Sequence, residues 1–232
     1  MDNNLVSVII PVFNAEKYVA EAICSVLSQT YKNIEVICIN DKSTDNSLSV
    51  LKSFGDKIII INNEDNCGTA ESRNKSIRLA RGEFLAFIDN DDIWENNKLQ
   101  VQINQFRNSS NLDISFSYMQ CFISPEISKE AKNLSYCPPD PIPGYIPSTI
   151  LVKRTSFEKV GYFDSRWKNG ESVDWIFKAQ EAELNIQVIN QVLVKRRIHE
   201  TNKGILDSST SKSEYLKIIR ESVNRRRNNQ AV

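Results

Sequence analysis

The sequence lacks an excess of charge of either sign, because 29 lysines and arginines balance 29 aspartates and glutamates among its 232 residues. Proteins that hold nucleic acid through their overall field carry a marked basic excess. We therefore expect no nucleic-acid partner, and any recognition by charge has to be local. A basic run near the C-terminus, at 225–227, predicts either a solvated helix end or a contact with anionic lipid or another partner.

Paired cysteines and long apolar runs are missing too. The five cysteines are widely spaced and never form a C-x-x-C pair, which argues against a zinc site of that kind and favours reduced thiols. No apolar run approaches the roughly 20 residues that span a bilayer, and the first residues show no basic region followed by an apolar stretch. We expect a cytoplasmic protein that is at most peripheral at the inner face of a membrane.

The first ninety residues contain a regular alternation of two patterns. Short β-branched runs predict buried strands, and the stretches between them place apolar residues on one helical face. Strands are expected at 5–10, 34–39, 57–61 and 84–88, and helices at 15–29, 44–54 and 69–80. This alternation predicts an α/β fold with a Rossmann-like, mostly parallel central sheet flanked by helices. Such sheets bind ligands at the carboxyl ends of their strands.

Beyond residue 95 the pattern is less regular. A proline-rich loop at 138–147 has apolar segments on both sides and no flexible linker beside it, so we expect it to form a wall over the sheet. We expect one domain over 1–205, with a first half at 1–95 and a second at 96–205, and then a basic helix or tail at 206–232. The expected elements of the second half are a helix at 95–107, apolar alternation at 112–123, a strand at 149–153, helices from 155 and near 172–183, and a strand at 186–195.

A run of acidic side chains, Asp89-Asn90-Asp91-Asp92, directly follows the strand expected at 84–88. Carboxylates crowded at the ligand edge of a sheet repel one another unless a cation lies between them. Oxygen ligands favour Mg²⁺ or Mn²⁺, which often share a site between one or two carboxylates and substrate phosphates. The alternative for an isolated acidic turn is a solvated cap on the helix that follows.

A second acidic turn, Asp41 to Asp45, follows the strand at 34–39 in the same way. A carboxylate there can accept hydrogen bonds from a uracil N3–H or from ribose hydroxyls, while Ser43 or Thr44 caps the next helix. Alone, this segment is only a turn and a cap. Two acidic turns after neighbouring strands, opposite a polar turn at 11–14, indicate a nucleotide pocket.

Three segments of the chain resemble family 2 glycosyltransferases, which have the GT-A fold and use nucleotide sugars. The segments are VSVIIPVFNAEKYVAEAICSVLSQTYKNIEVICINDKSTDNS, NEDNCGTAESRNKSIRLARGEFLAFIDNDD and KVGYFDSRWKNGESVDWIFKA. The resemblance covers roughly residues 5–200 and is specific for the family, although not for the sugar. It implies that 1–95 is the nucleotide-binding half and 96–205 the acceptor-side half.

The resemblance also implies roles for individual residues. Asp89 and Asp91, separated by Asn90, correspond to a D-x-D pair on ribose and metal, with Asp91 the expected direct ligand. A guanidinium such as that of Arg73 can neutralise phosphate oxygens, and its alternative is a surface cation on a helix. His199 is expected to contact metal or phosphate rather than to be a purely structural histidine. The remaining implied donor-binding residues are Pro11, Phe13, Asn14, Glu16 and Asp41 at the nucleoside, Asn66, Gly68, Asn74 and Arg197 at the diphosphate, and Asn90 between the two acids.

The expected general base departs from the commonest family pattern. Many members carry Glu-Asp with a further Asp two residues later, and the first Asp is the base, whereas this chain has Glu171-Ser172-Val173-Asp174. An unactivated serine cannot accept the proton, so the resemblance leaves Asp174 or Glu171 as the base. Residues three apart share a helix face, so either could reach the acceptor. Alternatively, both acids only complement the helix dipole.

The resemblance, together with the acidic turns, implies a metal-dependent, inverting glycosyltransferase that moves a sugar from a nucleotide diphosphate sugar, expected to be a UDP-sugar, to a hydroxyl acceptor. The metal is Mn²⁺ or Mg²⁺, and the setting is polysaccharide or glycoconjugate biosynthesis. One alternative, motivated by Ser172, is a catalytically degenerate protein that binds a nucleotide sugar without turnover. Another is a nucleotidyltransferase, which is disfavoured because the N-terminus has no glycine-rich, lysine-bearing loop to hold a triphosphate.

Overall fold

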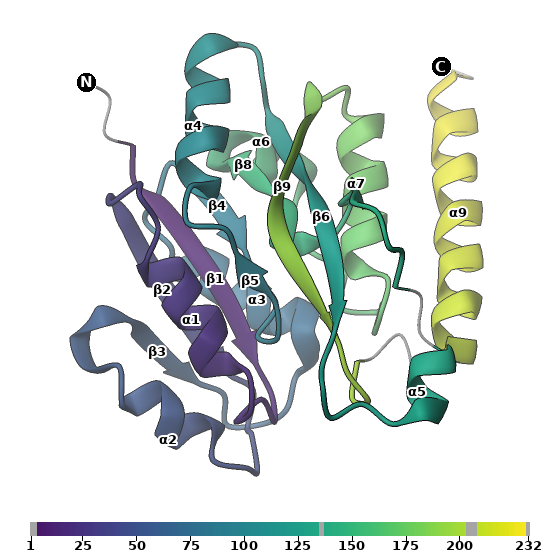
Figure 1. Ribbon diagram of the computed structural model, residues 1–232. Coiled ribbons are helices and arrows are strands. Elements are labelled where there is room, and N and C mark those ends of the chain that lie inside the picture. The colour runs from purple at the N-terminus through teal and green to yellow at the C-terminus, as the bar shows by residue number, and fades with distance from the viewer. Residues whose placement is uncertain (1–3, 135–136, 203–207, 231–232) are drawn as a thin grey trace.

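A computed structural model describes residues 4–134, 137–202 and 208–230 of the chain. Within these ranges a nine-stranded sheet has helices on both faces (Figure 1). The expectation of an α/β fold with a mostly parallel central sheet is confirmed. The helices are α1 (Val19–Leu27), α2 (Ser47–Lys52), α3 (Gly68–Leu79), α4 (Lys98–Asn108), α5 (Lys129–Leu134), α6 (Arg154–Val160), α7 (Glu171–Glu181) and α9 (Ser208–Gln230), with 3₁₀ turns η1 (Gly55–Lys57) and η2 (Pro147–Thr149).

The first half of the sheet is parallel. Its strands are β1 (Val6–Val12), β2 (Ile34–Asn40), β3 (Ile59–Asn62) and β4 (Phe84–Phe87), in the spatial order β3-β2-β1-β4. The carboxyl ends of β1, β2 and β4 therefore open onto one edge. This arrangement brings the turns at 11–14, 41–45 and 89–92 together, as the sequence predicts.

The second half of the sheet mixes directions. Strand β8 (Leu151–Lys153) runs antiparallel to β4 and to β6 (Ile114–Ile123), and β6 pairs in parallel with β9 (Ile186–Ile198). Strands β5 (Ile93–Trp94) and β7 (Ile142–Pro143) are two-residue pairings that the sequence pattern does not predict. The strand expected at 57–61 begins later, at Ile59, because residues 55–57 form η1.

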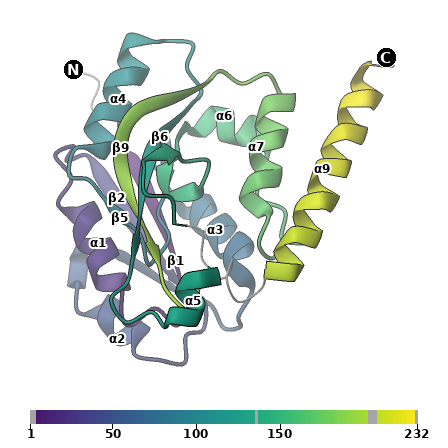
Figure 2. The same ribbon diagram turned by 45° about the vertical axis from the view of Figure 1, so that its right-hand side comes forward.

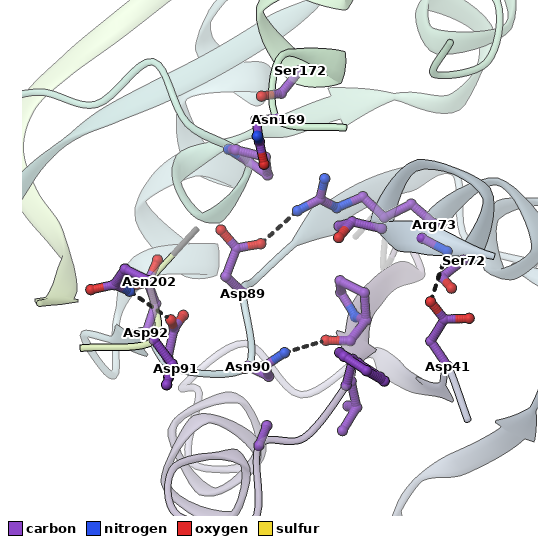
Figure 3. A pocket seen from close by; sticks show the side chains of 18 of the residues that line it. Asp41, Ser72, Arg73, Asp89, Asn90, Asp91, Asp92, Asn169, Ser172 and Asn202 are labelled. Atoms are coloured by element: carbon purple, nitrogen blue, oxygen red, sulfur yellow. Dashed lines mark hydrogen bonds and ion pairs between the residues drawn. The ribbon is translucent and has the colours of Figure 1, made fainter. Parts of the chain in front are cut away.

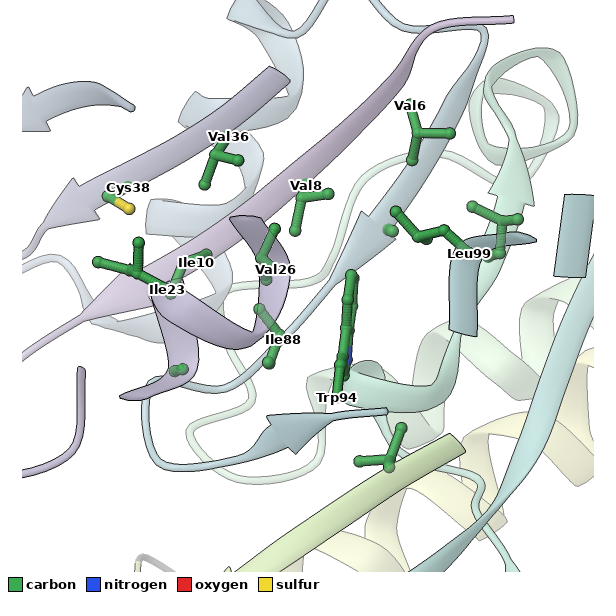
Figure 4. Packing of buried hydrophobic residues seen from close by; sticks show 14 of the residues in the cluster. Val6, Val8, Ile10, Ile23, Val26, Val36, Cys38, Ile88, Trp94 and Leu99 are labelled. Atoms are coloured by element: carbon green, nitrogen blue, oxygen red, sulfur yellow. The ribbon is translucent and has the colours of Figure 1, made fainter. Parts of the chain in front are cut away.

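Strand β1 shows why the first half of the chain folds as it does. Its residues are all buried, because helices cover both faces of the sheet. Val8 and Ile10 pack with α1 in one cluster, whereas Ile9 packs in the other cluster with residues of α3 and α7. Figure 4 shows β1 side chains interleaving with Ile23 and Val26 of α1.

The last described helix, α9, packs along α7 at one edge of the molecule (Figures 1 and 2). Its Ile218 is fully buried, and its Arg225 pairs with Glu181 of α7 at 2.6 Å. The start of the basic run therefore lies against the protein. No helix in the described ranges has both the length and the apolar character needed to cross a bilayer.

Gly82, between α3 and β4, gives a test of the sheet packing. A Cβ added there would lie 2.6 Å from the Ser7 backbone N and 2.7 Å from the Leu5 carbonyl O, so backbone has to move. We expect Gly82→Ala to lower the free energy of unfolding by about 2 kcal/mol or more in urea denaturation. In Gly170→Ala the close contact is the end of the flexible Ile218 side chain, and the loss should be smaller. An equal or larger loss for Gly170→Ala would contradict this prediction.

Candidate active site

A cavity of about 650 Å³ opens at the carboxyl ends of β1, β2 and β4, a size usual for a site that binds a small molecule. The start of α7 and the segment after β9 close its other side. Most residues that the sequence singles out line it, but Glu16, Asn74 and Asp174 do not. Those that do are Pro11, Phe13, Asn14, Asp41, Asn66, Gly68, Arg73, Asp89, Asn90, Asp91, Glu171, Arg197 and His199.

Asp41, directly after β2, holds the first residues of α3 in place through hydrogen bonds. Its carboxylate accepts hydrogen bonds from the backbone N–H of Cys67 (2.9 Å) and of Gly68 (2.8 Å), and from the Asn63 amide (2.8 Å). Burial alone raises its pKa, but these donors outweigh burial and the net pKa is lowered. Gly68 has a φ of 83°, a left-handed conformation that favours glycine. Asp41 is therefore an ionised group that also shapes the pocket wall.

The turn after β1 is held by side chains rather than by regular structure. Asn14, with a φ of 47°, accepts a hydrogen bond from the Thr44 backbone N–H at 2.8 Å. Glu16 accepts from the backbone and side-chain nitrogens of Asn46, each at 2.9 Å. Glu16 thus connects the β1 and β2 turns from outside the cavity. Asn90 adds a third connection, donating its amide hydrogen to the Pro11 carbonyl at 2.8 Å (Figure 3).

Arg73 of α3 is buried and lies between two carboxylates. Its guanidinium contacts Asp89 Oδ1 and Glu171 Oε1, each at 2.5 Å, and Figure 3 shows the contact with Asp89. The alternative of a surface cation is therefore wrong, since the residue is only 2% exposed. Its neighbour Asn74 is also buried and exchanges two hydrogen bonds with the backbone of Phe163. These two residues tie α3 to the second half of the chain.

Asp91 meets the segment that follows β9. Its Oδ2 lies 2.8 Å from His199 Nε2 and 3.1 Å from the Asn202 amide nitrogen. On the other side of the ring, Thr201 Oγ1 lies 2.9 Å from His199 Nδ1. In one tautomer Nε2–H donates to Asp91 Oδ2 and the Thr201 hydroxyl donates to Nδ1, so both contacts are satisfied. In the other tautomer Nδ1–H donates to Thr201 and the lone pair of Nε2 faces Asp91 Oδ2, an arrangement that suits a cation between these two atoms.

Asp92 and Arg197 hold the backbone next to Asp91 in place. The backbone N–H of Arg197 donates to Asp92 Oδ1 at 3.1 Å, and its Nε–H donates to the Asp91 carbonyl at 3.0 Å. Ser148 donates to the other Asp92 oxygen at 2.5 Å. Burial raises the pKa of Asp92 well above its usual range, and the charges of Asp91 and Asp89 raise it further.

The two acids considered as the base lie in different surroundings. Glu171 lines the cavity and is paired with Arg73, whereas Asp174 is buried beneath α9. Asp174 Oδ2 pairs with Lys178 Nζ at 2.6 Å, and its Oδ1 lies 3.4 Å from Arg225. Ser172 lines the cavity, so the position where many family members are expected to carry the base holds a hydroxyl group (Figure 3).

Sequence reasoning missed several cavity residues. Asn169 and Tyr215 line the cavity from a loop and from the last helix, and Ser148 of a 3₁₀ turn donates to Asp92 beside it. No local motif marks them. Tyr18, whose ring centroid lies 4.6 Å from that of His199, was also missed, although it stands at the start of α1 near the β1 turn.

The sheet, with its parallel first half and mixed second half, and the helices on its two faces have the GT-A fold of glycosyltransferases. The model of glycosyl transferase family 2 matches residues 7–161, more than half of the chain. The chain therefore belongs to glycosyl transferase family 2, as the sequence motifs indicate.

Named relatives agree with this assignment. An uncharacterized glycosyltransferase of Rickettsia typhi is 35% identical over 210 residues, covering 84% of this chain and 64% of that protein. The Escherichia coli UDP-Glc:alpha-D-GlcNAc-diphosphoundecaprenol beta-1,3-glucosyltransferase WfgD is 43% identical over 119 residues, covering 51% of this chain and 46% of its own length. The chain thus spans less than two thirds of either relative.

Solved structures share the fold. Staphylococcus aureus TarS 1–349 in complex with UDP-GlcNAc matches with a TM-score of 0.71 at 21% identity, over 85% of this chain and 59% of that one. The Pyrobaculum calidifontis mannosyltransferase PcManGT in complex with GDP-Man and Mn²⁺ matches with a TM-score of 0.63 at 17% identity, over 82% and 56%. At these identities the likeness shows the GT-A fold.

Replacing Arg73 tests the buried ion pairs. Arg73→Met leaves Glu171 and Asp89 without their cation, and we expect the free energy of unfolding to fall by about 3–5 kcal/mol in urea denaturation. The double variant Arg73→Met/Glu171→Gln should recover part of this loss. Arg78→Met removes an exposed arginine of the same helix and should change stability by less than about 1 kcal/mol. Equal effects of the two arginine substitutions would refute the buried bridge.

Proposed function

We propose that this chain transfers a sugar from a UDP-sugar to a hydroxyl acceptor with inversion at the anomeric carbon, using Mn²⁺ or Mg²⁺. The observation that carries the proposal is the pairing of Asp91 with His199 beside Arg73, Asp89 and Glu171 in one cavity of a family 2 protein. This combination offers a place for a metal, a diphosphate and an acceptor within one pocket. The fold neighbour TarS has been solved with UDP and with UDP-GlcNAc, which supports a uridine donor.

The nucleoside would lie over the turns that follow β1 and β2. Pro11, Phe13 and Asn14 line that end of the cavity, and Asp41 is ionised there as an acceptor for a base N–H. Phe13 is 46% exposed, so its ring is available for stacking on a base. The diphosphate would extend toward Arg197, with Asn66 and Gly68 on the α3 side. Glu16 and Asn74 would support these loops and not touch the donor.

Asp91 and His199 have the chemistry needed to bind a divalent cation. Asp91 offers a carboxylate oxygen and His199 an imidazole nitrogen, and both are ligands that Mn²⁺ accepts. The described residues hold no group of three or more His, Cys, Asp or Glu side chains arranged around one point. Metals of this kind are usually bound by one or two protein side chains together with phosphate oxygens of the substrate. When bound, the cation would offset charge on the departing diphosphate, as a Lewis acid does.

The protein groups would then direct the displacement. The acceptor hydroxyl oxygen attacks the anomeric carbon as the bond to the diphosphate oxygen breaks, and a carboxylate takes the hydroxyl proton. Glu171 is the better candidate for this base, because it lines the cavity and Asp174 is covered by α9. Its Oε1 is held by Arg73, so Oε2 would receive the proton. Attack opposite the leaving group inverts the anomeric configuration.

The acceptor is proposed from the relatives alone. WfgD and a second Escherichia coli relative, WfaP, are named as glucosyltransferases that act on alpha-D-GlcNAc-diphosphoundecaprenol. A lipid-linked saccharide is therefore the acceptor class we propose, in polysaccharide or glycoconjugate biosynthesis. The protein would work in the cytoplasm at the inner face of the membrane.

One specific observation favours a second candidate function. Ser172 lines the cavity at the expected base position, and Glu171 is engaged by Arg73. Both features suit a protein that binds a nucleotide sugar without transferring it. Membership of a glycosyltransferase family disfavours a nucleotidyltransferase activity.

Calorimetric titration with UDP, with and without Mn²⁺, tests the donor site. We expect Mn²⁺ to strengthen UDP binding, and Asp91→Asn or His199→Ala to remove this enhancement because each loses a proposed ligand. Asp56→Asn changes an exposed acid on η1 and should leave binding unchanged. UDP binding that is the same with and without the metal would count against the metal site.

Transfer assays with UDP-glucose and a synthetic GlcNAc-diphosphate lipid separate the two candidate functions. If Glu171 is the base, Glu171→Gln should lower kcat by about 10²-fold or more while UDP binding persists, and Asp174→Asn should retain turnover. If the protein is degenerate, the native chain shows no transfer or donor hydrolysis, and Ser172→Asp introduces it. The free energy of unfolding of each variant, measured in urea, shows whether a loss of activity comes from lower stability after the Arg73–Glu171 pair is broken. Full transfer by Glu171→Gln would exclude Glu171.

A further inference from the structure

Helix α9 carries apolar side chains on two opposite faces. On the inner face Ile218 is fully buried. On the outer face Leu216, Ile219 and Val223 are 70%, 47% and 42% exposed. Residues three and four apart lie above one another on a helix, so these three form a single apolar stripe. A stripe of large aliphatic side chains differs from scattered exposed residues, which are common on any protein.

The charges beside this stripe are all positive. Lys212 lies four residues before Leu216, Arg220 lies four residues after it, and Arg227 lies four residues after Val223. The same helical spacing places these cations along the side of the helix that bears the stripe. We call Lys212, Leu216, Ile219, Arg220, Val223 and Arg227 the outer face of α9.

Both acids of α9 point toward the protein instead. The Glu214 carboxylate accepts the backbone N–H groups of Lys168 and Asn169, at 3.1 and 2.9 Å. Glu221 lies 3.4 Å from the guanidinium of Arg166. The outer face of the described helix therefore combines an apolar centre with cations and has no acid to offset them.

In Figures 1 and 2, α9 stands at one edge of the molecule with α7 on its inner side and no other described element beyond its outer side. We propose that the outer face of α9 docks on a lipid bilayer that contains anionic headgroups. The aliphatic stripe would enter the boundary between headgroups and acyl chains, and the cations would meet lipid phosphates.

Charge disfavours a second copy of this chain as the occupant. In a two-fold antiparallel pairing centred on the stripe, Lys212 would approach Arg227 of the other copy, and the two Arg220 side chains would lie close together. No acid on the outer face could relieve this repulsion. An anionic surface has the complementary charge.

Docking through this face would place the cavity near the bilayer. Ser211 and Tyr215 of the same helix line the cavity, which puts the outer face about one helix diameter, ~10 Å, from it. The benefit for a lipid-linked acceptor rests on the proposed function, whereas the docking itself does not. A headgroup sugar displayed at the bilayer would then have a short path to the pocket.

Sedimentation of the whole 232-residue chain with lipid vesicles tests the proposal. We expect binding to phosphatidylglycerol mixed with phosphatidylcholine, little binding to phosphatidylcholine alone, and weaker binding at high salt. The triple variant Leu216→Ser/Ile219→Ser/Val223→Ser should lower the partition coefficient by about tenfold or more, and Arg220→Ser/Arg227→Ser by about tenfold. Matched controls should bind as the native chain does: Leu79→Ser, at a 59% exposed leucine on α3, and Lys52→Ser/Lys57→Ser.

Three results would overturn docking: no native binding to anionic vesicles, binding that the outer-face variants leave intact, or a dimer in light scattering that the triple variant dissociates. The last result would assign the face to a second copy. UDP calorimetry on the same samples keeps the two proposals apart. Lost vesicle binding with normal UDP binding concerns the outer face alone, whereas vesicle binding without UDP binding would count against the proposed function.

Discussion

Two carboxylates from different halves of the chain meet one buried guanidinium, and the cavity is arranged around that contact. Asp89 follows β4 and Glu171 begins α7, and each lies 2.5 Å from Arg73 of α3. A buried arginine is tolerated only when its charge is paired, so the three residues have to be positioned together. The pairing therefore fixes where α7 begins relative to the edge of the parallel sheet. It also means that Arg73 organises the site, since two acids already occupy its guanidinium.

The three acids that follow β4 have separate partners and hence separate properties. Asp89 is paired with Arg73, and Asp91 faces His199 and Asn202. Asp92 is buried, and burial raises its pKa well above the usual range. A short acidic turn would otherwise concentrate negative charge in a small volume. Of the three carboxylates, Asp91 is the one whose charge a bound cation would compensate most, because it faces an imidazole nitrogen rather than an arginine.

The elements and turns that depend on a local sequence pattern were predictable, whereas the positions of side chains that depend on contacts between distant segments were not. The strands and the turns after β1, β2 and β4 follow from β-branched runs ending in polar residues, and their convergence follows from the parallel sheet. Glu16 and Asn74 stand in the expected motifs, yet their side chains hold backbone outside the cavity. Ser148 and Tyr215 carry no recognisable spacing at all. Their places depend on how the second half of the sheet and the last helix pack against the first half.

Glu171 and Asp174 are only one helix turn apart on α7, and the sequence could not predict which of them lines the cavity. The first residue before α7 is Gly170, which has no side chain to cap the helix, and Ile218 of α9 occupies the space beside it. Glu214 of α9 instead binds the backbone N–H groups of the two preceding residues. Helix α9 thus packs on one side of α7, while Trp175 of α7 packs in the hydrophobic core on another side. Together these contacts turn Glu171 toward the cavity and Asp174 toward Lys178 and Arg225. Tertiary packing therefore contributes, with the sequence of α7 itself, to deciding which acid faces the cavity.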